Sequence, residues 1–324
     1  MLPLCWLAAG ALPTGVAAKP AAAASALPAA GFLTLEQLRA RYGDRDSRYV
    51  EIGGMSIRYK DQGRGPVIVL LHGSHSSLEG YDAMAKDLAR THRIIRFDMP
   101  GMGLSATLPA SSASAVRFGD DVLAGLLDHL GIRTADLVGV SSGGAIAYHF
   151  AARYPARVTA LVLSNTPADP VINANTPRSP ELAAEFAEAA RTGFRSRRYW
   201  SVYLRWLAAD PDRVSPAKID RYYDMNRRVA EKDSRYFWRA TSNPAETQAA
   251  LAGVKAPALL VWGLHDFVLP PATMGVLAGY LKAAPVSTIV LPDVGHYPPF
   301  EVPSRFADLT LSYLANVAHP ARAE

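Results

Sequence analysis

The chain has 324 residues, of which 49% are hydrophobic and 19% are charged. This composition is typical of a globular protein with a sizeable buried core, and it excludes an intrinsically disordered chain. The formal net charge of +5 is not gathered into a lysine- or arginine-rich tract, so we expect no nucleic-acid partner.

Residues 1–31 are predicted to be a signal peptide followed by a linker rich in alanine and proline. The stretch from Leu2 to Leu12 is mostly apolar but too short to span a bilayer as a helix. Val16-Ala17-Ala18 then has the small-residue pattern of a signal-peptidase site, although the segment lacks the usual early lysine or arginine. We therefore expect a periplasmic or secreted protein, the alternative being a cytoplasmic one with a disordered tail. The single cysteine, Cys5, lies in this segment, so the mature chain has no disulfide.

The first predicted elements are a helix and a hairpin. Thr34 and Gln37 form a capping-box pattern that predicts a helix over residues 35–42. Two strand-like stretches, residues 49–52 and 55–60, flank Gly53-Gly54, which predicts an antiparallel hairpin.

Six short apolar runs follow, and each reads as a buried strand. They cover residues 67–71, 93–97, 136–140, 158–163, 257–262 and 287–291. Helical stretches lie between them, at residues 78–90, 117–130, 144–154, 272–281 and 303–314. Apolar strands that alternate with helices predict an α/β protein with a mostly parallel twisted sheet, helices on both faces and the hairpin at one edge.

The alternation is interrupted between residues 167 and 243. This stretch is rich in aromatic residues and arginine and contains no strand-like run. We expect it to form a helical cap, or lid, over the ends of the strands. The core then consists of residues 32–166 and 244–324.

Ser141 is the predicted nucleophile. It is the centre of Gly139-Val140-Ser141-Ser142-Gly143, with a predicted strand directly before it and a predicted helix directly after it. A sharp turn of this kind exposes a serine at the carboxyl edge of a sheet, and glycines are needed because strand and helix approach closely. The alternative interpretation is a glycine-rich structural turn.

A serine hydroxyl needs a positioned base and, behind it, a carboxylate. His296 follows the last strand run and is the predicted base, whereas His72 is expected to orient its own loop. Asp266 follows the fifth run and is the predicted acid. Asp169, which follows the fourth run, is the alternative acid. His265, which directly precedes Asp266, is the alternative base.

The developing oxyanion needs N–H donors. We expect them from the backbone of Ser142, at the start of a helix, and of Ser74, after His72-Gly73. His75, Trp200, Tyr203 and Trp206 are predicted to line the substrate pocket, although the three cap residues also fit a packing role. One arginine of the set Arg195, Arg197 and Arg198 is a candidate for binding a substrate carboxylate, and a solvated helix face is the alternative.

These motifs together resemble the α/β-hydrolase family. The resemblance rests on the order Ser141, Asp266, His296, with His72-Gly73, Gly295-His296 and the loop of residues 98–103, and it extends from Tyr49 to Leu314. It implies a Ser–His–Asp triad, an oxyanion hole with two donors and a helical cap.

Departures from subfamily patterns narrow the substrate. Serine rather than aspartate at position 141 argues against epoxide hydrolases and haloalkane dehalogenases. The sequence after His72-Gly73 lacks the Gly-Gly-Pro-Gly run of proline iminopeptidases. It begins like the loop of meta-cleavage product hydrolases, which split C–C bonds, but does not continue with their glycines. The stretch from Ser141 to Gly144 is also similar to cofactor-free perhydrolases.

The sequence therefore predicts a serine esterase that acts on small-to-medium hydrophobic or aromatic carboxylic esters through an acyl-enzyme on Ser141. The first alternative is a C–C bond hydrolase of the meta-cleavage product type, and the second is a ligand receptor on an inactive hydrolase scaffold. No metal or cofactor is expected, because the histidines and the cysteine do not cluster. The oligomeric state is left open.

Overall fold

The structure is a computed structural model that describes residues 31–107, 118–170, 177–228 and 243–317. The predicted signal segment and most of its linker lie outside the described residues. So do residues 171–176 and 229–242 of the predicted cap.

Eight strands form one sheet in the order β1-β2-β4-β3-β5-β6-β7-β8. The pairs β1–β2 and β2–β4 are antiparallel, and the remaining neighbours are parallel. The predicted hairpin thus lies at one edge, and the mostly parallel α/β sheet is confirmed. The strands are β1 (Arg48–Ile52), β2 (Met55–Gln62), β3 (Val67–Leu71), β4 (Arg93–Phe97), β5 (Ala135–Val140), β6 (Val158–Ser164), β7 (Ala258–Gly263) and β8 (Val286–Leu291).

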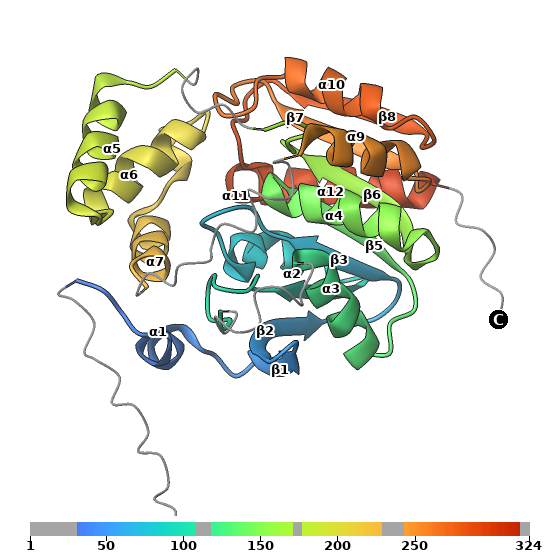
Figure 1. The fold of residues 1–324 in the computed structure, drawn as a ribbon, viewed down its shortest axis with the longest axis horizontal. Coiled ribbons are helices and arrows are strands. Elements are labelled where there is room, and N and C mark those ends of the chain that lie inside the picture. The colour runs from blue at the N-terminus through green and yellow to red at the C-terminus, as the bar shows by residue number, and fades with distance from the viewer. Residues whose placement is uncertain (1–30, 108–117, 171–176, 229–242, 318–324) are drawn as a thin grey trace, which may run out of the picture.

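Helices cover both faces of the sheet (Figure 1). On one face, α3 (Phe118–His129), α4 (Ser142–Arg153), α9 (Pro244–Gly253) and α10 (Ala272–Tyr280) bury side chains such as Leu126, Phe150 and Leu277. On the other face, α2 (Asp82–Leu88) and α12 (Pro303–Asn316) bury Met84 and Phe306. Short helical turns complete the core: η1 (Leu78–Tyr81), η3 (Pro155–Arg157) and α11 (Pro298–Glu301).

The order of the strands in the sheet explains why two central strands are buried along their whole length. Every residue of β5 and of β7 is buried, since these strands have neighbours on both edges and helices on both faces. The outermost strand β8 instead consists of exposed and partly buried positions, apart from the buried Leu291. The carboxyl ends of β5, β6 and β7 therefore meet at one edge in the middle of the sheet, where ligands of open α/β sheets bind.

The described part of the insertion between β6 and β7 forms the helices α5 (Pro180–Thr192), α6 (Arg197–Leu207) and α7 (Pro216–Asn226), with the short turn η5 (Pro211–Arg213). Ser179, Ser196 and Ser215 each cap one of the three α-helices through a side-chain oxygen. These helices form a separate group beside the core (Figure 1). They join it through Trp200, Ile219 and Phe300, which belong to one hydrophobic cluster.

The first helix, α1 (Leu35–Tyr42), has the predicted capping box. The Gln37 backbone N–H donates to Thr34 Oγ1 at 3.1 Å, and the Thr34 N–H donates to Gln37 Oε1 at 2.9 Å. This helix contacts the insertion, because the Tyr42 hydroxyl donates to Asp224 in α7. In Figure 1, α1 lies close to α7, although the two helices are far apart in the sequence.

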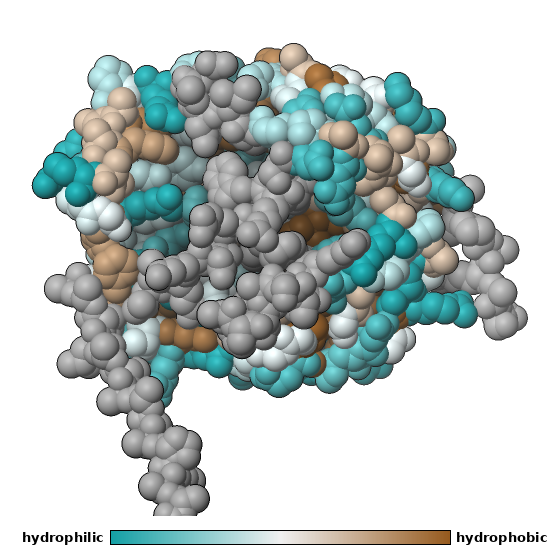
Figure 2. Space-filling model, in the orientation of Figure 1, coloured by the Kyte–Doolittle hydropathy of each residue, from teal (hydrophilic) through white to brown (hydrophobic). Residues whose placement is uncertain are grey.

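On the face shown in Figure 2, hydrophobic residues are scattered among hydrophilic ones in small separate patches, outside the grey atoms. Within the described ranges, no helix combines the length and the apolar character needed to cross a membrane.

Candidate active site

Ser141 lies at the sharp turn between β5 and α4. Its backbone has φ 54° and ψ −127°, a conformation that costs free energy for a residue other than glycine. Close packing enforces the turn: a Cβ atom on Gly139 would lie 2.6 Å from the Cα of Gly144. The Ser141 carbonyl accepts the N–H of Gly144 at 2.9 Å and so begins the helix. The strained serine therefore stands at the carboxyl edge of the sheet, as the sequence predicts.

His296 and Asp266 are brought together from two loops at the same edge. The His296 Nδ1 atom lies 2.8 Å from Asp266 Oδ2, and both side chains are buried. Because a carboxylate only accepts hydrogen bonds, Nδ1 carries the proton and Nε2 keeps its lone pair. The arrangement leaves an imidazole whose free nitrogen is available as a base.

Three further donors hold the Asp266 carboxylate. Its Oδ1 atom accepts the backbone N–H groups of Val268 at 2.8 Å and Leu269 at 2.9 Å. Its Oδ2 atom accepts Asn165 Nδ2 at 2.7 Å, in addition to His296. We did not predict a role for Asn165, although it follows the β6 run directly, just as Ser141 follows the β5 run.

Ser141 and His296 share no hydrogen bond in the described structure. Gly73 lies between Ser141 and Tyr297, the residue after His296: a Cβ atom placed there would be 3.1 Å from Ser141 Cβ and 3.3 Å from a ring carbon of Tyr297. Hydrogen bonds between a nucleophile and its base are often long without substrate. The structure thus places the serine beside the histidine loop without joining the two side chains.

The loop after β3 brings the two predicted oxyanion donors together. Ser74 Oγ and Ser142 Oγ are 3.0 Å apart, so the two residues are in contact. Within the described residues, neither backbone N–H donates to a protein acceptor. Ser142 is the first residue of α4, where N–H groups lack intrahelical partners and the helix dipole favours negative charge.

His72 contacts the backbone of two loops through its two ring nitrogens. Its Nε2 atom accepts the Met99 N–H at 3.0 Å, and its Nδ1 atom lies 2.9 Å from the Gly73 carbonyl. Burial lowers the pKa of His72, which keeps the ring neutral. The ring therefore ties the loop after β3 to the loop after β4.

Tyr297 and Glu301, which follow His296, are positioning residues that sequence reasoning missed. The Gly73 N–H donates to the Tyr297 hydroxyl at 3.1 Å, and burial raises the pKa of this hydroxyl, which stays protonated. The buried Glu301 carboxylate accepts the N–H groups of Gly295 at 3.0 Å and Ala209 at 2.9 Å. The N–H of His296 itself donates to Leu207 at 2.8 Å. The histidine loop is thereby fixed both to the serine side and to the insertion.

The rival residues are placed elsewhere. The Asp169 carboxylate accepts the Tyr280 hydroxyl at 3.3 Å and makes no contact with His296 among the described hydrogen bonds. His265 is exposed, and its backbone N–H donates to Val294. Among the described residues there is no group of three or more His, Cys, Asp or Glu side chains that could hold a metal ion.

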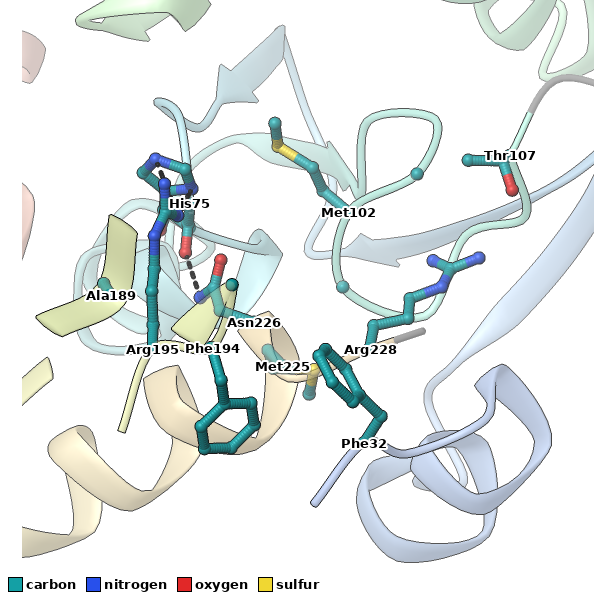
Figure 3. Close-up of a pocket in the computed structure, with 14 residues that line it drawn as sticks. Phe32, His75, Met102, Thr107, Ala189, Phe194, Arg195, Met225, Asn226 and Arg228 are labelled. Atoms are coloured by element: carbon teal, nitrogen blue, oxygen red, sulfur yellow. Dashed lines mark hydrogen bonds between the residues drawn. The ribbon is translucent and has the colours of Figure 1, made fainter. Parts of the chain in front are cut away.

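A cavity of about 330 Å³ opens beside the loop after β3 (Figure 3). It is lined by His75 and Ser76 of that loop, by residues of the 101–107 loop, and by the ends of α5 and α7. Two arginines, Arg195 and Arg228, line it, and none of the lining residues in the described part of the chain is acidic. In Figure 3 the Arg195 guanidinium lies against the His75 ring, and its Nη1 atom is 3.5 Å from the ring nitrogens.

Of the four predicted pocket residues, His75 lines this cavity and the three aromatic residues do not. Trp200 is fully buried and packs edge-on against His75, with ring centroids 5.6 Å apart. Tyr203 packs between Trp200 and Trp206. Trp206 stacks on the exposed Phe267, the residue after Asp266, at 6.2 Å. The aromatic residues of α6 therefore run from the cavity wall toward the acid loop.

The other two candidate arginines are already paired. Arg197 forms an ion pair with Asp220, and Arg198 contacts Glu181 and Glu185. Arg195 has no carboxylate partner among the described residues and instead lies over the rings of Tyr199 and Trp200. Burial and the nearby Arg195 cation lower the pKa of His75 to about 3, so His75 is neutral.

The α/β-hydrolase fold family model matches residues 66–303, well over half of the chain. The chain belongs to the α/β-hydrolase family. The match includes the serine turn, the acid loop and the histidine loop described above, and the fold expected from the resemblance is thus confirmed.

Individual relatives carry the names of different hydrolases. The chain is 28% identical to 2-hydroxymuconate semialdehyde hydrolase from Pseudomonas sp. (strain CF600), covering 83% of the chain and 93% of that protein. It is 29% identical to a 2-hydroxy-6-oxononadienedioate/2-hydroxy-6-oxononatrienedioate hydrolase from Paraburkholderia phymatum, covering 83% and 95%. Among solved structures, a thermophilic esterase from Thermogutta terrifontis is similar, with a TM-score of 0.62, 27% identity, and coverage of 84% and 99%.

Proposed function

We propose that Ser141, His296 and Asp266 form the catalytic triad of a serine hydrolase. The observation that carries the proposal is the buried hydrogen bond of 2.8 Å between His296 Nδ1 and Asp266 Oδ2, at the sheet edge that presents the strained Ser141. In the first step Ser141 Oγ attacks a carbonyl carbon while His296 Nε2 takes its proton. The backbone N–H groups of Ser74 and Ser142 receive the oxyanion.

The leaving group then takes the proton from His296, and an acyl group remains on Ser141. Water attacks the acyl carbon, His296 accepts the water proton, and the acid is released with Ser141 regenerated. Asp266 holds the ring and stabilises the imidazolium in both steps. All of these groups come from the chain itself.

For the bond that is cleaved, we propose the C–C bond between a carbonyl carbon and a conjugated carbon, as in a 2-hydroxy-6-oxo-dienoate. Two relatives that align over more than nine-tenths of their own length carry names of this class. Their substrates are carboxylates, and the cavity, whose described lining includes Arg195 and no acidic residue, suits an anion.

Carboxylic-ester hydrolysis, which the sequence favoured, is the second candidate. The same triad cleaves an ester when the leaving group is an alcohol, and the similar Thermogutta terrifontis structure is an esterase. Ester cleavage needs no anion site, so it would leave Arg195 without a role in turnover.

The experiment is a comparison of purified protein on a ring-fission dienoate and on a panel of p-nitrophenyl esters, with Ser141→Ala as control. Dienoate cleavage with a higher kcat/KM than any ester supports C–C hydrolysis. Ester turnover without dienoate cleavage would replace it by the second candidate. If the protein cleaves neither the dienoate nor the esters, and the parent and Ser141→Ala bind ligand equally well, the protein is a receptor.

A further inference from the structure

Asn165 occupies the position between the nucleophile and the acid. It is the first residue after β6, whose neighbours β5 and β7 lead to Ser141 and Asp266. Ser141 donates its N–H to the Ser164 carbonyl at 3.0 Å, and Asn165 donates its own to Val261 in β7 at 3.2 Å. The Asn165 side chain is completely buried, and its φ of 46° lies in the left-handed region. A polar amide that is buried at such a position needs partners.

The partners determine which way the amide points. Its Nδ2 atom donates to Asp266 Oδ2 at 2.7 Å and to the Gly295 carbonyl at 3.3 Å. Its Oδ1 atom accepts the Ser164 hydroxyl at 2.8 Å. A flipped amide would place its oxygen against a carboxylate and a carbonyl, two groups that only accept hydrogen bonds. The amide hydrogens therefore face the acid and the peptide group that precedes His296.

We propose that Asn165 is a positioning residue that aligns the His296–Asp266 pair, an inference that rests on the proposed triad. Its amide holds both sides of the pair: the oxygen that receives the His296 proton, and the carbonyl of Gly295, which is joined to His296 by a peptide bond. Without this donor, Asp266 Oδ2 is free to rotate toward other partners, and the imidazole loses its alignment toward Ser141. Asn165 acts through Asp266 and touches no reacting atom.

A purely structural role is the alternative, since asparagine is favoured where φ is positive. Two substitutions separate the roles. Asn165→Gly keeps the left-handed backbone and removes the amide. Asn165→Asp keeps the size and shape, but replaces the donor by an oxygen beside the Asp266 carboxylate.

The test measures how fast a fluorophosphonate probe labels Ser141 between pH 5 and 9, which needs no known substrate. We expect labelling by Asn165→Gly to be about 10- to 100-fold slower than in the parent, the effect of losing one hydrogen bond to a charged group. For Asn165→Asp we expect the acid limb of the profile to move to higher pH, because a second carboxylate favours the protonated imidazole.

The control is Val162→Ala, which opens a cavity in the same strand without touching Asp266. It should lower the unfolding midpoint and leave the labelling rate and its pH profile unchanged. Parent-like rates and profiles in both folded Asn165 variants would overturn the inference alone. If Asn165→Gly does not fold, the pH profile of labelling in the isosteric Asn165→Asp decides between the positioning role and the structural role. A parent protein that is not labelled at Ser141 would overturn the triad itself.

Discussion

The carboxylates of Asp266 and Asp169 follow neighbouring strands but have different surroundings. Asp266 is buried and accepts hydrogen bonds from His296, Asn165 and two backbone N–H groups. Asp169 is reached by the Tyr280 hydroxyl. The surroundings therefore favour Asp266 as the residue that orients the base.

Asp266→Asn should lower kcat by about 10⁴-fold, since the amide lets His296 adopt the wrong tautomer. Asp169→Asn is the matched control, a substitution of the same kind at the next strand end, and should stay within about twofold of the parent. Steady-state kinetics on the best substrate of the panel measures both. A larger loss in Asp169→Asn would assign the acid to Asp169.

Arg195→Gln should raise KM about 10-fold for a substrate with a carboxylate and leave KM unchanged for a neutral ester of the same size, since only the anion loses its cation. Arg198→Gln, which removes an arginine that already contacts Glu181 and Glu185, is the control and should change neither KM. Equal effects of Arg195→Gln on both substrates would show that it acts through packing.

Sequence patterns predicted the residues that follow strand runs, and missed those whose role depends on distant partners. Ser141, Asp266 and His296 each stand just after an apolar run, so parallel strands bring them to one edge. The partners of Asn165 lie 101 and 130 residues away, and the Tyr297 hydroxyl reaches a residue 224 positions earlier. No local pattern contains such contacts.

Among the elements, the histidine loop depends on α11 for its shape. Glu301 at the end of α11 is buried, and burial raises its pKa, although its backbone partners and Arg213 oppose the shift. Its carboxylate joins Gly295 and Tyr297 to Ala209 of the insertion. Glu301 therefore fixes the loop together with the contacts of Tyr297, His296 and Asn165 described above.

Glu301→Ala should destabilise the protein by about 2–5 kcal/mol, because it leaves several buried N–H groups without an acceptor. Glu301→Gln, which keeps one acceptor oxygen, should cost less. Urea unfolding measures both. Glu188→Ala, which removes an exposed carboxylate paired with Arg191 on α5, should lower the free energy of unfolding far less than Glu301→Ala. A similarly small loss of stability in Glu301→Ala would show that Glu301 does not hold the histidine loop.

Strand and helix positions followed closely from apolar periodicity, because strands buried on both faces leave continuous runs. Runs 67–71 and 93–97 coincide with β3 and β4. Run 257–262 is shifted by one residue from β7, and the other three runs differ from their strands by one residue at one end. The predicted helix over residues 78–90 is instead divided into η1 and α2 and ends at Leu88. Periodicity does not register such a change of helix type.

Across the whole molecule, His72 and His75 lie on the loop after β3, and the Asn226 side chain of the insertion donates to the His75 carbonyl. Burial lowers the pKa of both histidines, that of His75 to about 3 with help from Arg195. An unfolded chain protonates histidine near pH 6.5. The contribution of these neutral histidines to the free energy of unfolding is therefore fully present above that pH. It falls as the pH drops below that value toward the folded pKa values.

His75→Asn should reduce this acid sensitivity by at most about 1.4 kcal/mol per pH unit between pH 6 and pH 4, the contribution of one proton. Asparagine tolerates the positive φ of 63° at this position. Urea unfolding at several pH values gives the slopes. If the slopes of variant and parent are the same, His75 is not kept neutral by the fold.

The most direct test of the proposed chemistry is the site of fluorophosphonate labelling, read by mass spectrometry of the intact protein and its peptides. One probe group should attach to Ser141, labelling should vanish in Ser141→Ala, and it should be at least about 100-fold slower in His296→Ala. The circular dichroism of both variants should match that of the parent. Labelling at another residue, or undiminished labelling of Ser141→Ala, would contradict the assignment of Ser141 as the nucleophile.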